Sequence, residues 1–398
     1  MDFYIQMGHG MQTMCKELTS EWGSSKIILS PLNLPPERLE KFTSDIEKVN
    51  GSVLFDPQLY FPRKYHKNLA KYNYWPQDEI TNLENGNCDT LIGKLYELNK
   101  RISTSSFILP SFIVSKIDHR WNALQQSYIT KAQSYSPDKA LISTVAITGE
   151  VLSDSTQVEQ IIQYIEHWNV EGIYIVCEHP DRYYLVDQPL WLSNLLALVA
   201  GIKRQHKKVI VGYASHQMLC LAMAKCDAIA SGNFLNVRWF KPEHFETMED
   251  DGISRRAIWY YCPQALSEYK VPFLDIAQRM GKLDVMKPAP EMMNPYCDML
   301  FAGSLPSSTG YKESHAHRHY LCCLRYQSLM ATRDSYSETM DSQLLILETA
   351  EQILSGLRSK GIRGQDRDFS DIIDVNRAAI AVHDAEFRFT LSREWETL

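Results

Sequence analysis

The stretch Ser52–Pro62 places a carboxylate directly after a run of apolar residues. Its sequence, SVLFDPQLYFP, closes the apolar run with Asp56, which Pro57 and Gln58 follow. A carboxylate held there could act as a general acid or base or as a nucleophile, and the Gln58 amide could read the edge of a planar ligand. The same residues could instead begin an ordinary turn. The choice depends on whether the rest of the chain brings similar residues to the same place.

Polar residues also follow most of the other short apolar runs, and they supply further candidates for a site. We predict that Asp56 acts as acid or base and that Glu178 or Asp118 serves as a second carboxylate. The residues that we predict to bind substrate are Gln58, Gly149, His9, His216, Gly232 and Asn233.

Some of these residue types also bind metals. His9, Glu178, His179 and His216 offer imidazole and carboxylate groups that suit Zn, Mn or Fe, which leaves a metal-dependent hydrolase open as an interpretation. No HxH or HExxH spacing accompanies them. The segment HAHRHYLCC (His315–Cys323) is more typical of a polar, partly buried helix face. We therefore predict neither a metal nor a cofactor.

The candidates follow eight short runs rich in Ile and Val, as strands buried on both faces are. Helix-period segments separate most of the runs, which predicts parallel βαβ units. Eight units predict an α/β fold of the closed (β/α)8 barrel type, in which residues after the strands meet at one mouth. An open doubly wound sheet is the alternative. The runs are Phe3–Met7, Lys26–Ser30, Ser52–Asp56, Phe107–Val114, Ala140–Ile147, Gly172–Glu178, Lys208–Ala214 and Cys226–Ser231.

Two regions interrupt or follow the barrel pattern. We predict a barrel domain over 1–308, which includes an insertion at 63–106 after the third strand and an irregular region at 237–308. Three helical stretches then predict a helical C-terminal appendage over 309–398. These stretches are 312–333, 339–360 and 369–389.

The insertion mixes cations with aromatic rings. Such interleaving suits a phosphate backbone and stacked bases, but a lid packed on the barrel rim would have the same composition. Both interpretations stay open. The residues concerned are Arg63, Lys64, Tyr65, His66, Lys67, Lys71, Tyr72, Tyr74 and Trp75.

Composition limits the class of protein. The 398 residues include 41 basic and 48 acidic side chains, for a formal charge of −7, which argues against a broad nucleic-acid-binding face. The nine cysteines form no CxxC pair, so neither a disulfide framework nor a zinc ribbon is indicated. No apolar run approaches the ~20 residues that a membrane span needs. Since Met1–Met7 has a strand pattern rather than that of a signal peptide, we expect a cytoplasmic protein that does not bind membranes.

Three segments resemble the tRNA-guanine transglycosylase-like barrels. ALISTVAITGE resembles the family's fifth strand, with Thr148-Gly149 in place of a Gln-Gly pair, and VLFDPQLY resembles its DSGGFQ segment. KVIVGYASHQMLCLAMAKCDAIAS resembles the two strands around GVGTPEDLLRAVALGVDMFD. The family's nucleophilic Asp falls on Ala230, and its CxCxxC zinc cluster is absent where this chain has GSLPSSTGYKES.

The resemblance implies a protein directed at a nucleobase, a nucleoside or a nucleic acid (tRNA or DNA), with glycosidic-bond chemistry of a transglycosylase or glycosylase kind. In that family the Asp that aligns with Asp56 contacts the heterocycle. Without the nucleophile, Asp56 could still support direct hydrolysis by water, or the barrel could only bind a base.

A non-catalytic binding or assembly subunit is the alternative, because the nucleophile is missing and the helical tail is long. Such helices often dock partners, so we expect a protein partner or a second copy to use the C-terminal helices. The apolar residues that would form this surface are Leu344, Leu345, Leu347 and Ile353.

Overall fold

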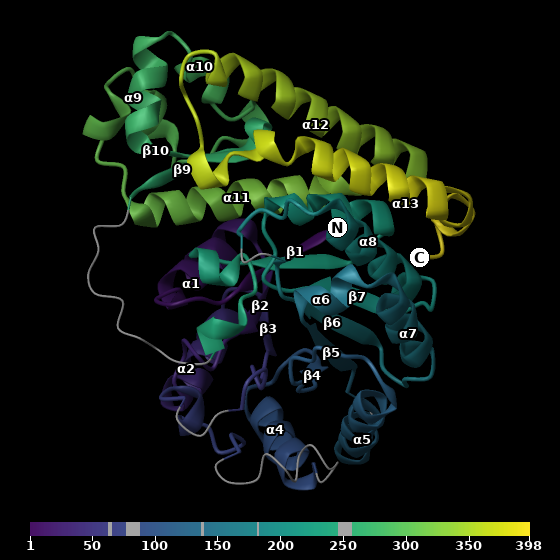
Figure 1. The fold of residues 1–398 in the computed structure, drawn as a ribbon. Coiled ribbons are helices and arrows are strands. Elements are labelled where there is room, and N and C mark those ends of the chain that lie inside the picture. The colour runs from purple at the N-terminus through teal and green to yellow at the C-terminus, as the bar shows by residue number, and fades with distance from the viewer. Residues whose placement is uncertain (63–65, 77–87, 137–138, 181–182, 246–256) are drawn as a thin grey trace.

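Eight parallel strands form a nearly closed barrel in the computed structural model, which describes residues 1–62, 66–76, 88–136, 139–180, 183–245 and 257–398 (Figure 1). The strand order is β3-β2-β1-β8-β7-β6-β5-β4, so neighbours in the sheet are consecutive in the chain except for β1 and β8, the first and last barrel strands, which pair with each other. The two ends of this order approach each other where the Ser105 N–H donates to Val53 O at 2.9 Å. The predicted (β/α)8 fold is confirmed. The strands are β1 (Asp2–Gln6), β2 (Ser25–Leu29), β3 (Gly51–Phe55), β4 (Phe107–Ile108), β5 (Leu141–Ile147), β6 (Gly172–Cys177), β7 (Lys208–Val211) and β8 (Ala228–Ser231).

Alternation along each strand divides the core into an inner and an outer layer. In β3, Leu54 joins the cluster that fills the barrel, whereas Val53 and Phe55 pack into the outer core. Continuing the period of two, Asp56 points inward just past the end of β3. Other members of the inner cluster are Tyr4, Ile28, Ile142, Tyr174, Ile210 and Ala230.

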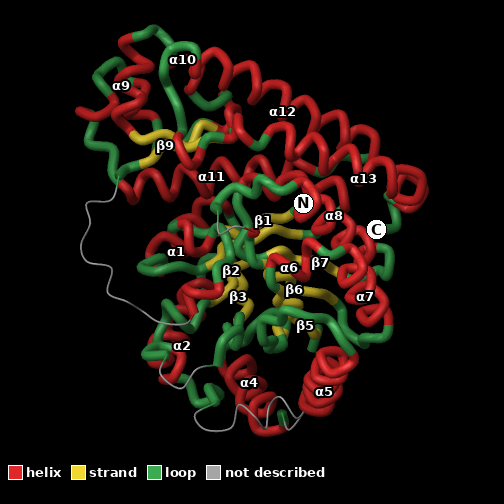
Figure 2. Tube along the Cα trace, in the orientation of Figure 1, coloured by secondary structure: helices red, strands yellow, loops and turns green. Residues whose placement is uncertain are grey.

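Helices surround the sheet (Figure 2). The helix α4 lies between β3 and β4, so the predicted insertion at 63–106 contains the regular barrel helix of that unit. The outer helices are α1 (Gln12–Trp22), α2 (Pro36–Glu47), α4 (Asp89–Arg101), α5 (His119–Tyr135), α6 (Gly149–Ser153), α7 (Ser155–Glu166) and α8 (Pro189–Lys203), and a 3-10 helix, η3 (His216–Ala224), connects β7 to β8.

The aromatic residues that the structure describes in the insertion pack on the barrel. Tyr72, Tyr74 and Trp75 are buried, and the Tyr74 hydroxyl donates to Pro57 O at 2.8 Å. Because these rings are covered, they do not offer faces on which bases could stack in this structure. Arg63, Lys64 and Tyr65 lie outside the described residues.

The C-terminal region contains a β-hairpin and several helices, and it lies along one side of the barrel (Figure 1). The three predicted C-terminal helices are confirmed as α11, α12 and α13. The elements are β9 (Trp259–Cys262), β10 (Ser267–Lys270), α9 (Val271–Arg279), α10 (Leu283–Met286), α11 (Glu313–Ala331), α12 (Tyr336–Arg358) and α13 (Ile373–Glu394).

Helix α11 completes the outer layer of the barrel. Its Ser328 hydroxyl hydrogen-bonds to Met1 O and Asp2 O, both at 3.1 Å, at the amino end of β1. Its first residues lie near His9, at the carboxyl end of the same strand. This is the place that the helix following the eighth strand takes in a (β/α)8 barrel. The predicted division of the chain at 308/309 stays a prediction, although α11 packs as part of the barrel.

Candidate ligand-binding cavity

Asp56 is buried inside the barrel mouth and is surrounded by neutral hydrogen-bond donors. Its Oδ1 accepts from the Gln58 N–H at 2.9 Å. Its Oδ2 accepts from three tyrosine hydroxyls, those of Tyr60 at 2.9 Å, Tyr213 at 3.2 Å and Tyr174 at 3.4 Å. Burial raises the pKa of Asp56 to about 6, although these hydrogen bonds favour the ionised form.

Aromatic rings cover this carboxylate. Tyr60 and Tyr213 pack edge to face with Phe240, at 5.1 and 5.3 Å between ring centres, and Phe245 stacks on Phe240 at 5.5 Å. Asp56 is only 1% exposed as a result. A substrate could reach Asp56 only after these rings had moved.

The side-chain amide of Gln58 forms its hydrogen bonds with other residues of the protein. Its Oε1 accepts from the Ser30 hydroxyl and the Leu32 N–H, both at 3.0 Å, and its Nε2 donates to the Tyr213 hydroxyl at 2.9 Å. The amide therefore fixes the loop after β3 in this structure and offers no free edge to a planar ligand.

The other predicted carboxylates lie apart from Asp56. Glu178, at the end of β6, accepts from the Gly149 N–H at 3.2 Å, so the structure does bring these two predicted residues together. Asp118 caps α5, because its Oδ1 accepts from the N–H groups of Arg120 and Trp121, both at 3.0 Å. Within the described ranges, no hydrogen bond connects either carboxylate to Asp56.

His216 belongs to the packing between the barrel and the C-terminal region. Its ring lies 5.0 Å from that of Tyr261 and 5.8 Å from that of Phe369, and burial lowers its pKa to about 4. Gly232 is needed for close packing, since a Cβ there would lie 2.4 Å from Gln6 O. Neither residue offers a side chain to a ligand.

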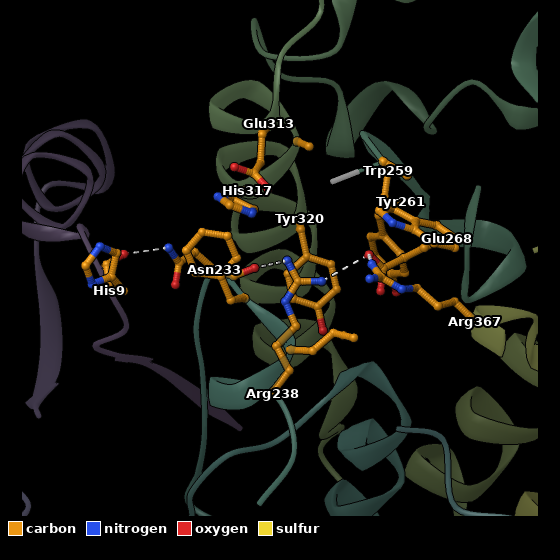
Figure 3. Close-up of a pocket in the computed structure, with 14 residues that line it drawn as sticks. His9, Asn233, Arg238, Trp259, Tyr261, Glu268, Glu313, His317, Tyr320 and Arg367 are labelled. Atoms are coloured by element: carbon orange, nitrogen blue, oxygen red, sulfur yellow. Dashed lines mark hydrogen bonds and ion pairs between the residues drawn. The ribbon is translucent and has the colours of Figure 1, made fainter. Parts of the chain in front are cut away.

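A cavity of about 520 Å³ opens beside the barrel mouth, between the ends of β1 and β8 and the C-terminal region (Figure 3). Two predicted substrate-binding residues, His9 and Asn233, line it on the barrel side. The hairpin, α11 and the short 3-10 helix η10 (Gln365–Arg367) form the opposite wall. The residues of this wall include Trp259, Tyr261, Glu268, Glu313, His317, Tyr320 and Arg367.

Two arginines, Arg238 and Arg367, donate to one buried carboxylate, that of Glu268, in the cavity wall. We call these three residues the triad. Glu268 Oε2 accepts from Arg238 Nη1 at 3.1 Å and from Arg367 Nη1 at 2.8 Å. Arg238 also donates to Gly232 O at 3.0 Å and to Asn233 O at 2.6 Å. The loop after β8 thus presents two carbonyl groups to Arg238.

The Glu268 carboxylate stays ionised across the neutral pH range. Burial alone would raise the pKa of Glu268, but Arg367 and Arg238 outweigh it and lower the pKa to about 2. Burial lowers the pKa of His317, on the same wall, to about 3. Two guanidinium groups therefore surround an ionised carboxylate at pH 7, and the His317 imidazole on the same wall is neutral.

Aromatic rings support the guanidinium groups. Arg238 lies 3.4 Å from the ring centre of Tyr320, and Arg367 lies 3.9 Å from that of Trp259. Flat side chains and fixed charges therefore line the same cavity.

Two polar atoms of the triad have no hydrogen-bond partner among the described residues: Glu268 Oε1 and Arg367 Nε. Buried polar atoms without partners are rare in folded proteins, so each needs an explanation such as a water or a ligand. One is an acceptor and the other a donor.

The sequence pattern identified only the barrel side of this cavity. Glu268 and Arg367 were missed because they follow no barrel strand. The aromatic, strand-favouring run WYYC, followed by a turn that contains Pro263, was the available signal for a hairpin. Nothing in the sequence placed that hairpin at the barrel mouth.

Among the described residues, the structure does not bring together the side chains of the metal sites considered in the sequence. His319 and Cys323 lie close together, with Sγ 3.6 Å from Nδ1, but His319 Nε2 contacts Tyr261 O at 2.8 Å. In the part of the chain that the structure describes, no group of three or more His, Cys, Asp or Glu side chains could hold a metal ion. His9 lines the cavity whereas His216 is buried in packing, so the four residues of the predicted hydrolase site do not gather.

Comparison with known proteins adds little to this picture. No family model matches the chain, and no curated protein matches it. Among solved structures it is similar to active domain 2 of a chitinase from Pyrococcus furiosus, with 11% identity over 63% of this chain and 90% of that chain. The TM-score is 0.35, so this likeness carries no argument about function. The relation to the tRNA-guanine transglycosylase-like barrels stays a resemblance.

Across the described ranges, no helix is long and apolar enough to cross a membrane.

Proposed function

We propose that this barrel protein binds a nucleobase or a nucleoside in the cavity between the mouth and the C-terminal hairpin. The observation that carries the proposal is Glu268, which is 3% exposed, lies between two guanidinium groups and has one oxygen without a partner among the described residues. A nucleobase would explain why a donor and an acceptor are left open in the same wall.

The chemistry of a base edge matches this wall. Bases carry N–H donors beside carbonyl or ring-nitrogen acceptors, so one edge can donate to a carboxylate and accept from a guanidinium group. Glu268 would accept from the base and Arg367 would donate to it once the wall had opened around these two atoms, which are buried in this structure. Trp259 and Phe234 supply aromatic faces of the kind on which bases stack. A volume of about 520 Å³ falls in the range of small-molecule sites.

The reaction that we propose for this site is hydrolysis of the glycosidic bond of a bound nucleoside. Glu313, the first residue of α11, is a second carboxylate in the cavity. It would give its proton to the departing base as the C–N bond breaks. Water would add to the anomeric carbon, and the Glu313 carboxylate would then take the proton of that water. Glu268 would hold the base throughout.

This assignment differs from the residues chosen by sequence, whose catalytic roles stay predictions. Asp56 is covered by rings, Asp118 caps a helix, and Glu178 pairs with a backbone amide. The non-catalytic alternative also stays open to test, because base binding without base release would support it.

Calorimetric titration of the full chain with purine and pyrimidine bases and nucleosides tests the binding. We expect at least one to bind with a dissociation constant below about 1 mM and Arg367→Ala to weaken it at least tenfold. Arg363→Ala, an exposed arginine just upstream of the same turn, is the matched control. Failure of every compound to bind at millimolar concentration would overturn the proposal.

A further inference from the structure

We propose that the ligand of this cavity is a ribonucleoside whose sugar lies along α11, with its 2′-hydroxyl hydrogen-bonded to the imidazole of His317. The inference rests on the proposed function and names the part of the ligand that the triad leaves unassigned. It is carried by the residues that one face of α11 presents to the cavity and by the side chains there that have no partner.

One face of α11 lines the cavity over two turns (Figure 3). Its cavity residues are spaced three or four apart, so they lie on the same side of the helix. They span about 10 Å at a rise of ~1.5 Å per residue, which is more than a single base covers. A base held at Glu268 therefore leaves part of this face to another portion of the ligand. The residues are Glu313, Ala316, His317 and Tyr320.

Tyr320 lies at the end of this face that adjoins the triad. Its ring centre is 3.4 Å from the guanidinium group of Arg238, which in turn donates to Glu268. His317 lies about one turn earlier in α11, and Glu313 lies a further turn earlier. The part of the cavity that is left for a sugar is therefore the part beside His317 and Glu313.

The polar side chains in this part of the cavity are available to a ligand. Within the described parts of the chain, the side chains of His9, Glu313 and His317 make no hydrogen bond or ion pair. The charged groups of the triad, by contrast, pair with one another. Unpaired polar groups in the wall of a cavity are those that orient a bound molecule.

Packing holds the His317 ring in place. It meets the ring of Phe234 nearly edge to face, with 4.6 Å between the ring centres and 79° between the ring planes. Phe234 belongs to the loop after β8 and also lines the cavity. This aromatic contact restrains the imidazole without a protein hydrogen bond to either of its nitrogens.

A neutral imidazole suits a hydroxyl group. Burial lowers the pKa of His317 to about 3, and the charge of Arg238 lowers it further, so the ring has one N–H donor and one nitrogen acceptor at pH 7. A sugar hydroxyl can pair with either nitrogen, because it both donates and accepts. An anionic phosphate would gain no charge-assisted hydrogen bond from this ring.

The position of Glu313 selects the 2′-hydroxyl. In the proposed reaction Glu313 acts at the glycosidic bond, and His317 is its neighbour at i+4 on the helix. The 2′-hydroxyl is attached to the carbon next to the anomeric carbon, so it is the sugar hydroxyl nearest to that bond. Hydrogen bonds to the corresponding hydroxyl strengthen in the transition state of glycoside hydrolysis.

Calorimetric titration of the full chain tests the inference with adenine, guanine, cytosine and uracil and with the ribonucleoside and 2′-deoxyribonucleoside of each. We expect the ribonucleoside of the preferred base to bind about fivefold or more tightly than its deoxy form, the size of one hydrogen bond. His317→Phe keeps a ring against Phe234 and should reduce this preference below twofold while changing the affinity for the free base less than twofold. His167→Phe, at an exposed histidine at the end of α7, is the matched control and should keep the preference.

The outcomes separate this inference from the proposed function. Equal affinities for the two nucleosides, or a preference that His317→Phe leaves intact, would overturn the inference while base binding that depends on Arg367 still stood. If no base or nucleoside binds, both fail. Circular dichroism of His317→Phe establishes that the fold is kept.

Discussion

Arg238 Nη1 lies 3.1 Å from Glu268 Oε2, and both side chains are 3% exposed. This ion pair joins the loop after the last barrel strand to the C-terminal hairpin. It therefore fixes the two walls of the cavity relative to each other. Because the pair is buried, its effects on stability and on binding should both be measurable.

Glu268→Gln should lower the free energy of unfolding by about 3–5 kcal/mol, the usual result of leaving a buried charge without its partner. Urea denaturation at pH 7 measures this change. Glu291→Gln, at an exposed carboxylate, should change it by less than about 0.5 kcal/mol. Equal stabilities for the two variants would show that the buried pair does not stabilise the fold.

The stabilisation from Glu268 should depend on pH in a defined direction. The pKa of Glu268 is about 2 in the folded protein and 4.5 ordinarily, so its contribution is complete above pH 4.5 and is lost as the pH falls toward 2. The difference in unfolding free energy between wild type and Glu268→Gln should therefore shrink only below pH 4.5. A difference that shrinks between pH 5 and 8 would contradict this assignment.

Titration of Asp56 should change the free energy of unfolding with pH in the opposite direction. Its pKa rises from 3.8 to about 6 on folding, so the folded state binds the proton more tightly and loses stability as the pH rises from 4 to 6. The loss should be on the order of 3 kcal/mol, at ~1.4 kcal/mol for each pKa unit.

Asp56→Asn removes this titration. Its unfolding free energy, measured by urea denaturation at half-unit pH steps, should fall less than that of wild type between pH 4 and 6. Parallel curves for the two proteins would mean that Asp56 does not titrate in this range.

Trp259→Ala should weaken binding of a base about 10- to 100-fold, because stacking on an aromatic ring contributes ~1–3 kcal/mol per base. Trp259→Phe keeps a ring and should lose much less. Titration calorimetry with the best ligand compares the two variants. If both weaken binding equally, Trp259 contributes through the packing of Arg367 rather than through stacking on the ligand.

Glu313→Gln should reduce release of free base from a bound nucleoside at least 100-fold, because the amide cannot donate the proton. Binding itself should change by less than threefold. Chromatography of the reaction mixture measures the free base. Binding without release in the wild type would favour the non-catalytic alternative, and unchanged release in the variant would exclude Glu313 as the acid.

The sequence predicted the barrel because each strand is a local signal. Runs such as Ala140–Ile147 are apolar along their length, and β5 (Leu141–Ile147) is buried at every position. It also predicted that Asp56 would lie at the end of a strand. It could not predict the rings over Asp56, since Phe240 and Phe245 reach the mouth from a distant, irregular segment.

The cavity was harder to predict for the same reason. His9 and Asn233 follow strands and were found, whereas Glu268 and Arg367 are 99 residues apart in the chain and meet only through the tertiary fold. Their pairing depends on where the hairpin packs, and no local spacing encodes that position.

Base binding is the central claim, and titration of the wild type, Arg367→Ala and Arg363→Ala with the same panel of bases and nucleosides tests it most directly. The account predicts that at least one compound binds to the wild type and to Arg363→Ala with similar affinity and at least tenfold more weakly to Arg367→Ala. Binding that Arg367→Ala leaves unchanged, or no binding at all at millimolar concentration, would contradict it.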